Sequence, residues 1–429
     1  MQCIQTFNPS YMADIFERLI KNYGPLGQHR ERAHGYFAFP KLEGEISNRM
    51  NFRGKEKIVW SLNNYLGLAN HPEVRKTDGD AAVEFGLATP MGARMMSGNT
   101  NHHEQLEREL AAFESKEDAI LLNFGYQGIL SLIDIMCSRH DVIVYDAECH
   151  ACIIDGLRLH TGHRFVYKHN DIADCEKQLQ RATALVEKNN TGGILLITEG
   201  VFGMAGDQGK LKEITELRPK YAFRMLVDDA HGFGTLGTTG AGAGEAQGVQ
   251  DEIDLYFSTF AKSMASIGAF IAGPKQIIDY IRYNIRSQIF AKSLPLPIVL
   301  GNLKRLELLK TKPELKNKLW ENALKLQEGL KEKGFDIGKT DSVVTPVYMK
   351  GGVEEATFMV TDLRENYNIF CSIVVYPVIP RGHIIYRLIP TAVHTDEDIA
   401  LTLKAFEETK KKLDEGAYKS EEIAQMSEA

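Results

Sequence analysis

The sequence carries, from residue 226, the run Leu226-Val227-Asp228-Asp229-Ala230-His231, an apolar strand that ends in two carboxylates and a histidine. Farther along lies the run Ser258-Thr259-Phe260-Ala261-Lys262-Ser263, in which a lysine is flanked by hydroxyl side chains. A pyridoxal phosphate (PLP) enzyme needs a lysine to form the Schiff base with the cofactor aldehyde. It also needs an aspartate that keeps the pyridine nitrogen protonated, so that the ring accepts electrons from a carbanion. Together, Asp228 and Lys262 therefore predict a PLP enzyme.

Length and composition are those of an ordinary globular protein. The 429 residues are 44% hydrophobic and 25% charged, which is enough for one large domain and a smaller one. The net charge of -7 and the scattered Lys and Arg argue against a nucleic-acid partner. No apolar run approaches the roughly 20 residues that span a bilayer, and the first residues lack the pattern of a secretory signal. Six dispersed cysteines suit reduced thiols, so we expect a cytoplasmic protein.

Apolar strands alternate with helical segments between residues 63 and 297. The expected strands are 119–122, 142–145, 165–167, 194–198, 225–227 and 255–257. Such alternation predicts an α/β fold, in which helices cover both faces of a mostly parallel sheet. We expect an N-terminal extension over residues 1–60, a large PLP-binding domain over 61–297 and a small C-terminal α/β domain over 298–429.

The flanking parts of the chain have simpler patterns. Residues 11–24 are typical of an amphipathic helix, and 58–62 of a strand. A long helical pattern over 298–334 leads to expected strands at 345–348, 371–375 and 384–388. A last helix is expected over 396–413, followed by a polar, frayed tail over 418–429.

Two motifs suggest chemistry that their context does not support. Gly232-Phe233-Gly234-Thr235-Leu236-Gly237 matches GxGxxG, but the glycines run on through residue 242 instead of opening a helix, which disfavours a dinucleotide site. Cys149-His150-Ala151-Cys152 matches CxxC, yet it lies deep in the large domain, where two buried thiols beside a useful histidine are expected. We expect no metal site.

Further polar residues follow other strands of the sheet, at the edge where ligands bind. His150 is placed to stack on a flat ring, with a packed or solvated histidine as an equal alternative. The run Asn123-Phe124-Gly125-Tyr126-Gln127-Gly128 allows backbone amides to approach a phosphate, although a simple tight turn has the same pattern. Thr259 can add a hydroxyl there.

Two charged residues belong to the same prediction. Glu199 closes an expected strand, where a solvated carboxylate is the alternative. Arg387 lies inside an apolar strand, where a charge is costly unless it is paired, so we expect it to face an anion such as a substrate carboxylate.

With these motifs in order, the chain resembles the α-oxoamine synthases, which are fold-type I PLP enzymes, over about residues 58–410. The matching stretches are Asn63-Asn64-Tyr65-Leu66-Gly67-Leu68, His103-Glu104-Gln105-Leu106-Glu107, Asp146 through Asp155-Gly156, Thr198-Glu199-Gly200-Val201-Phe202, Asp228 through Gly232, Thr259 through Ser263, and Arg387 through Thr395. Within the family, the stretches 263–268, 282–290 and 374–380 are similar to bacterial serine palmitoyltransferases. Sulfonolipid synthases, which use cysteate, belong to the same family.

The resemblance implies a role for each of the site residues. Lys262 is the Schiff-base lysine, Asp228 the partner of the pyridinium nitrogen, His150 the ring-stacking residue and His231 a donor to the cofactor hydroxyl. The remaining implied contacts are Gly125, Tyr126 and Thr259 to the phosphate, Glu199 within the cofactor site, and Asn63 and Arg387 to the amino-acid carboxylate. Family members are homodimers with the active site at the interface, so Asn63 is placed to serve the partner's site.

The implied reaction is a decarboxylative condensation of an amino acid with a long-chain fatty acyl thioester. It yields a 3-keto long-chain amine and carbon dioxide, as the first step of lipid-base synthesis. The thioester is acyl-CoA or acyl carrier protein, since both carry the same arm, and peripheral contact with a membrane surface is compatible with such a substrate.

The departures from the family pattern bear on the amino acid. Gly203-Met204-Ala205-Gly206 replaces a run with Ser-Met and an acidic residue, Asn123-Phe124 replaces two small hydroxyl residues, and Ala291-Lys292 replaces a Ser-containing pair. These changes remove negative charge or add a cation, which favours a substrate with a second anionic group. We therefore place L-cysteate ahead of L-serine, with glycine or alanine behind, and expect His102, Arg94 or Lys292 to hold the sulfonate. Neutral drift is the alternative explanation.

Two other functions would use the same fold. A catalytically silent partner subunit is disfavoured by the presence of Lys262 and Asp228. An ordinary aminotransferase would use the same two residues, but it would need a 2-oxo acid and would release no carbon dioxide.

Overall fold

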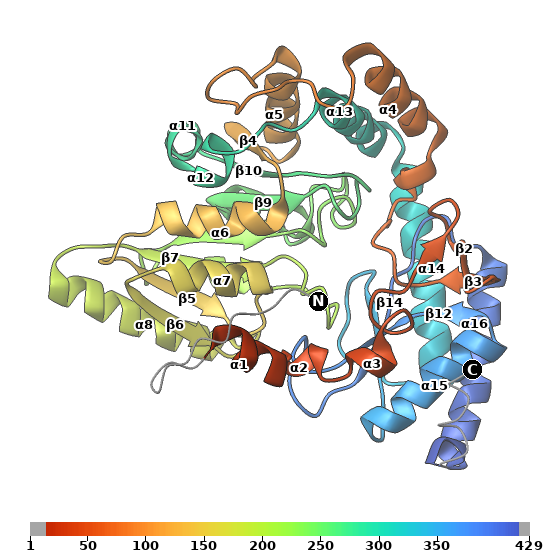
Figure 1. Ribbon diagram of the computed structural model, residues 1–429. Helices are drawn as coiled ribbons and strands as arrows, with labels where there is room; N and C mark the ends of the chain where they lie inside the picture. Colours follow the sequence, from red (N-terminus) through yellow and green to blue (C-terminus); the bar gives the residue numbers. More distant parts are fainter. Residues whose placement is uncertain (1–13, 420–429) are drawn as a thin grey trace.

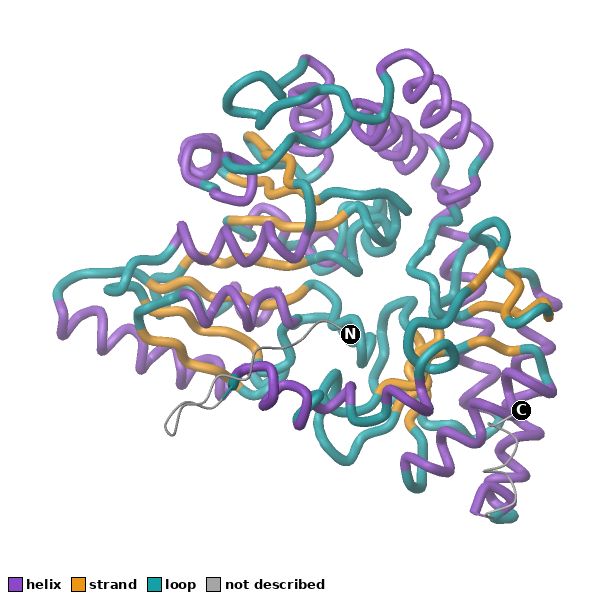
Figure 2. The backbone as a smooth tube through the Cα atoms, viewed as in Figure 1, coloured by secondary structure: helices purple, strands orange, loops and turns teal. Residues whose placement is uncertain are grey.

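The computed structural model describes residues 14–419, and the expected features at residues 1–13 and 420–429 lie outside the described part. The chain forms a large α/β unit and a smaller second unit beside it (Figure 1). Between the large sheet and the second unit the chain is mostly loop (Figure 2). No helix of residues 14–419 is long and apolar enough to cross a bilayer.

The large unit is built on a seven-stranded sheet in the order β4-β10-β9-β8-β7-β5-β6. Its strands are β4 (Asp118–Leu122), β5 (Val142–Asp146), β6 (His163–Tyr167), β7 (Ile194–Glu199), β8 (Arg224–Asp228), β9 (Leu255–Thr259) and β10 (Ala269–Gly273). Only β10 runs against its neighbours; β9, β8, β7, β5 and β6 pair in parallel. The predicted mostly parallel sheet is therefore confirmed.

Helices cover both faces of this sheet, which explains why its strands are apolar at nearly every position. One face packs against α6 (Gly125–Met136), α7 (Ala151–Leu159) and α11 (Lys275–Asn284) (Figure 1). The other packs against α5 (Asn101–Phe113), α8 (Ile172–Asn189) and α13 (Leu296–Thr311). Successive residues of β7 alternate between the faces: Leu195 and Ile197 belong to the first core and Leu196 to the second.

The remaining helices of the large unit are short or peripheral. They are α4 (Pro72–Phe85), α9 (Leu211–Thr215), α10 (Ala243–Ala246) and α12 (Arg286–Ile289). The described part of the chain begins with three short helices, α1 (Ile15–Lys21), α2 (Gly24–Gly27) and α3 (Arg30–Ala33).

The second unit combines strands from both ends of the chain. One sheet has the order β1-β2-β3-β12 and the other β11-β14-β13. The strands are β1 (Leu42–Glu43), β2 (Arg49–Phe52), β3 (Lys55–Val59), β11 (Thr345–Tyr348), β12 (Ile369–Phe370), β13 (Ser372–Val374) and β14 (Ile385–Leu388), with helices α14 (Pro313–Glu332), α15 (Val353–Asn366) and α16 (Asp396–Asp414). The division at residues 60 and 297 stays a prediction, and residues 42–59 share a sheet with β12.

Several elements differ from the sequence prediction. Strands β1 and β2 were not expected in the N-terminal extension, and the strand expected at 58–62 is β3 at Lys55–Val59. Strand β10 was not expected, because it is a short apolar run between glycines that has no helix before it to mark it as a new α/β repeat. The single helical pattern over 298–334 is two helices, α13 and α14, separated at Lys312. Pro313 lacks the backbone N–H that a continuous helix would need.

Buried Arg364 on α15 joins the N-terminal segment to the second unit. Its guanidinium donates to the carbonyl oxygens of Tyr36 at 2.7 Å and Cys371 at 2.8 Å, and it lies 4.2 Å from the ring centroid of Phe370. Lys57 of β3 donates to the carbonyl oxygen of Arg364. The planar, five-donor guanidinium lets one side chain satisfy two buried carbonyls at once.

Arg364→Lys should therefore lower the melting temperature. A single ammonium cannot reach both carbonyl oxygens, and a lost hydrogen bond from a charged group costs roughly 1.5 to 3 kcal/mol. Thermal unfolding followed by circular dichroism would measure the shift. The matched control is Arg158→Lys, at an exposed Arg that pairs with Asp155, where little change is expected. Equal melting temperatures for both variants would contradict this role of Arg364.

Candidate functional site

Chemically active side chains gather where the parallel strands of the large sheet end. Asp228 is the last residue of β8, and it lies beside Glu199, the last residue of β7, in the strand register. Lys262 follows in the turn between β9 and β10. The carboxyl ends of parallel strands form the ligand-binding edge of an open α/β sheet. This edge faces the second unit across the loop region (Figure 2).

The central charges of the site are Asp228 and Lys262. Asp228 is 4% exposed, and its carboxylate accepts a hydrogen bond of 3.1 Å from the Ala230 N–H. Burial raises the pKa of Asp228, while the positive charges of Lys262 and His150 oppose the rise. Burial also lowers the pKa of Lys262, against the attraction of Asp228 and Glu199. A lysine of lowered pKa more readily provides the free amine that attacks a carbonyl.

His150 caps the start of α7 with its ring exposed. Its Nδ1 accepts a hydrogen bond of 3.3 Å from the Cys152 N–H, and its own backbone N–H donates to the Glu199 carboxylate. Burial and the charge of Asp228 raise the pKa of Glu199 well above its ordinary value. Glu199 thus fixes the backbone that presents the His150 ring at the sheet edge.

His231 is buried and is held by a residue that the sequence analysis did not assign. Its Nδ1 lies 2.7 Å from the hydroxyl of Tyr65, which is fully buried. Burial lowers the pKa of His231 well below its ordinary value, and the charges of Lys262 and Arg387 act in the same direction. Tyr65 stands in the run that starts at Asn63, so its motif was recognised but its side chain was not.

Arg387 of β14 brings a positive charge from the second unit. Its Nε donates to the carbonyl oxygen of Gly203 at 2.7 Å. Burial lowers the pKa of Arg387. Within residues 14–419, no carboxylate lies within ion-pair distance of its guanidinium. A largely buried guanidinium without a counter-ion favours binding of an anion.

The start of α6 lies against the end of β9. A Cβ atom added to Gly125 would lie 3.3 Å from both Cβ and Oγ1 of Thr259, so a larger residue would crowd the gap between them. Phe124, the N-cap of α6, makes no side-chain cap. The first amides of this helix are therefore available to an anion. Tyr126 lies in the first turn and donates its hydroxyl hydrogen to Asp155, with its ring centroid 6.2 Å from that of His150.

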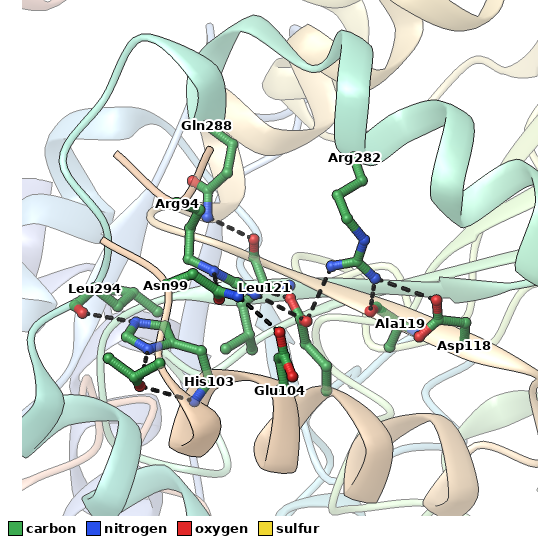
Figure 3. Close-up of polar contacts among 12 residues, drawn as sticks. Arg94, Asn99, His103, Glu104, Asp118, Ala119, Leu121, Arg282, Gln288 and Leu294 are labelled. Atoms are coloured by element: carbon green, nitrogen blue, oxygen red, sulfur yellow. Dashed lines mark hydrogen bonds and ion pairs between the residues drawn. The ribbon is translucent and has the colours of Figure 1, made fainter. Parts of the chain in front are cut away.

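Two of the expected anion-binding residues make other contacts. Arg94 donates to both oxygens of Glu107, at 2.7 and 3.0 Å, and to Asn99 at 2.7 Å. Arg282 pairs with the same Glu107 and also with Asp118, and Figure 3 shows the Arg282–Asp118 contact. The ring of His102 packs edge-on against Phe85, with centroids 6.4 Å apart.

Within the described part of the chain, no hydrogen bond or ion pair joins Arg94 or His102 to Asp228 or Lys262. Their substrate roles stay predictions, and so does that of Asn63, whose buried Oδ1 has no partner in the described part.

A histidine bridge lies on the same edge of the sheet. His169 follows β6, and its Nδ1 lies 2.9 Å from Oδ1 of Asp146 while its Nε2 lies 2.8 Å from Oδ2 of Asp207. Burial alone would lower the pKa of His169, but the hydrogen bonds and charges of the two carboxylates raise it to about 10. This bridge was not predicted from the sequence, because Asp146 ends a strand while His169 and Asp207 lie in two separate loops.

Comparison with known proteins gives consistent matches. The family model described as aminotransferase class I and II matches residues 55–406. A cysteate-C-fatty acyltransferase of Capnocytophaga ochracea is 61% identical over 409 residues, covering 95% of this chain and 97% of the relative. A serine palmitoyltransferase of Bacteriovorax stolpii is 34% identical, covering 88% of each chain. An 8-amino-7-oxononanoate synthase of Thermoanaerobacter pseudethanolicus is 35% identical, covering 89% of this chain and 95% of the relative.

Solved structures agree with these matches. A serine palmitoyltransferase of Sphingomonas wittichii superposes with a TM-score of 0.85 at 28% identity, covering 93% of this chain and 98% of that chain. A structure of SPT with its PLP internal aldimine has the same TM-score, 0.85, and covers 99% of that chain.

Stability should depend on pH through His169. A folded pKa of about 10 exceeds the ordinary value of roughly 6.5. The stabilisation is therefore complete below about pH 6.5 and is lost as pH rises through about 10. The difference in melting temperature between the wild type and His169→Gln should be largest near pH 6 and shrink toward pH 10.

The matched control is His163→Gln, at an exposed histidine of β6. It should show no such trend between pH 6 and pH 10. If the melting-temperature difference between the wild type and His169→Gln does not change with pH, His169 is neutral in the folded protein.

Proposed function

The chain belongs to the aminotransferase class I and II family and, within it, to the α-oxoamine synthases, and on this premise we propose that its amino-acid substrate is L-cysteate. The enzyme uses PLP to condense an amino acid with a fatty acyl thioester. With cysteate, the products are a sulfonated 3-keto long-chain amine and carbon dioxide, the first step toward a sulfonolipid base. The observation that carries this choice is the 61% identity to a cysteate-C-fatty acyltransferase, against 34% to a serine palmitoyltransferase.

The site residues fit PLP. When bound, the cofactor supplies an electron sink that stabilises negative charge on the amino-acid Cα. We propose that Lys262 holds it covalently and moves the Cα proton, and that the Asp228 carboxylate pairs with the ring nitrogen. A buried carboxylate with a half-buried lysine nearby is the donor set that this cofactor needs.

The other cofactor contacts follow from their positions. The exposed ring of His150 is available for stacking on the pyridine. Gly125, Tyr126 and Thr259 surround the open N-terminus of α6, which suits the phosphate. With Nδ1 of His231 held by Tyr65, Nε2 is the nitrogen that can serve the cofactor hydroxyl. A Cβ at Gly203 would lie 2.1 Å from that Nε2, so a side chain at this position would collide with the His231 ring.

The amino acid is bound through two anionic groups in this proposal. Arg387 provides an unpaired guanidinium for the α-carboxylate, and Asn63 assists it. For the sulfonate, Lys292 is the best supported of the three expected cations. Its side chain is exposed and pairs with no carboxylate among residues 14–419, whereas Arg94 is bound to Glu107. Its carbonyl oxygen accepts a hydrogen bond of 2.6 Å from Asn123, two residues before the α6 N-terminus.

We also propose a homodimer in the cytoplasm. Several large apolar side chains of the large unit are exposed, among them Leu87 at 75%, Met96 at 84%, Phe124 at 55% and Phe290 at 75%. They come from adjoining segments, because the Gly92 carbonyl accepts the Ser293 N–H. Apolar groups clustered in this way favour an interface with a second copy.

Free thiols at Cys137, Cys149, Cys152, Cys175 and Cys371 support a reducing compartment. The acyl carrier is coenzyme A or acyl carrier protein.

The purified protein should be yellow, and Lys262→Ala should lose the absorption of the lysine-bound cofactor. Borohydride reduction of the wild type should fix PLP on the peptide that contains Lys262, as mass spectrometry would show. Lys275→Ala, at an exposed lysine of α11, is the matched control and should stay yellow. A colourless wild type that PLP cannot reconstitute would refute the cofactor assignment.

L-cysteate should saturate the site at a lower concentration than L-serine. The sulfonate adds a full negative charge, and a charge-assisted hydrogen bond is worth roughly 1.5 to 3 kcal/mol, or about tenfold or more in affinity. The change in cofactor absorption on adding each amino acid, without an acyl donor, measures this difference. Lys292→Gln should reduce the difference in affinity between cysteate and serine, because it weakens the binding of cysteate alone. Lys339→Gln, at an exposed lysine, should leave this difference unchanged.

Product analysis distinguishes the remaining alternatives. Turnover should require an acyl thioester and release carbon dioxide. If L-serine binds as tightly as L-cysteate and cysteate gives no condensation product, the enzyme is a serine palmitoyltransferase. Turnover that depends on a 2-oxo acid would indicate an aminotransferase.

A further inference from the structure

The loop over residues 202–208, between β7 and α9, is held by both units of the protein. On the side of the second unit, the Gly206 carbonyl accepts hydrogen bonds from Ser342 at 2.6 Å and Thr340 at 3.1 Å, and Asp341 accepts the Gln208 N–H at 2.7 Å. We call residues 202–208 the bridging loop.

On the side of the large unit, the bridging loop is held by the residues that follow β6. His169 spans Asp146 at the end of β5 and Asp207 in the loop. Its ring also meets Phe202 edge-on, with centroids 4.4 Å apart. Asn170 adds two hydrogen bonds, 2.8 Å to Asp207 and 3.0 Å to the Gln208 carbonyl. The His169 imidazole thus links the bridging loop to the end of β5 through a hydrogen bond at each ring nitrogen.

The same loop contacts the substrate-binding side of the site. The Gly203 carbonyl accepts the hydrogen bond of Arg387 at 2.7 Å, and Gly203 packs directly on His231. This carbonyl is the one hydrogen-bond partner of the Arg387 side chain within residues 14–419. The direction in which the guanidinium points is therefore set by the position of Gly203.

We propose that His169 is a positioning residue: by clamping Asp207, it holds the Gly203 carbonyl where it orients Arg387 toward the carboxylate of the amino acid. The proposal rests on the carboxylate-binding role of Arg387 proposed above. A protonated imidazole suits the task, since it faces Asp146 and Asp207 and, at 4.0 Å, Glu148. A neutral side chain would leave these carboxylates to repel one another and release the loop.

The test compares two ligands that differ only in the group that Arg387 is proposed to bind. Taurine is cysteate without its α-carboxylate. In titrations of the PLP-loaded enzyme followed by cofactor absorption, with no acyl donor, His169→Gln should weaken L-cysteate by about tenfold, the scale of one charge-assisted hydrogen bond. Taurine should change by less than about twofold. His163→Gln is the matched control and should alter neither.

A purely structural role would weaken both ligands equally or reduce PLP occupancy without changing their ratio, and either result would overturn the proposal. If His169→Gln does not fold, Asp207→Asn tests the same clamp, since it keeps the size of the side chain and an acceptor oxygen. It should again weaken cysteate more than taurine.

A double-mutant cycle completes the experiment. If His169 acts through Arg387, then His169→Gln should cost little further cysteate affinity in an Arg387→Lys background. Full additivity would overturn the proposal. The choice of cysteate is tested separately: if the wild type prefers L-serine, the pair L-serine and ethanolamine gives the same comparison of carboxylate binding.

Discussion

The burial of Asp228 beside Lys262 is the constraint around which this protein is organised. Two opposite charges removed from water cost several kcal/mol each unless they are compensated, and here burial shifts both pKa values toward the neutral forms. The strands that carry them must end at one edge, and the parallel register of β7, β8 and β9 ensures this. The fold keeps a pair that is costly by itself, which agrees with the proposed use of both residues to hold the cofactor.

The parts of the protein closest to this pair were predictable from the sequence. Strands that are apolar at every position and end in polar residues indicated both the parallel sheet and its ligand-binding edge. Asp228, Glu199, His150 and Lys262 could be placed there because each ends a strand or lies within four residues of a strand end. Local sequence order determines which residues leave the same edge of a parallel sheet, so no knowledge of distant contacts was needed.

Other features depend on contacts that sequence order does not encode. The Tyr65–His231 hydrogen bond joins residues far apart in the chain, and the His169 bridge joins the end of β5 to two loops. Arg94 was expected to be a free cation because nothing in its neighbourhood signals that Glu107 lies opposite it. Strand β10 was missed because its reversed direction breaks the α/β alternation. In each case the structure depends on a contact with residues distant in sequence, which the local sequence pattern does not indicate.

The parallel pairing of β3 with β12 has a consequence for synthesis on the ribosome. One edge of β3 has no partner until residue 370 has been translated, so the sheet of the second unit closes only after the whole large unit has left the exit tunnel. During this interval the nascent chain carries an unpaired strand edge, which is a site for mistaken association with other chains. A chaperone that shields N-terminal segments during translation would thus act on β2 and β3 first.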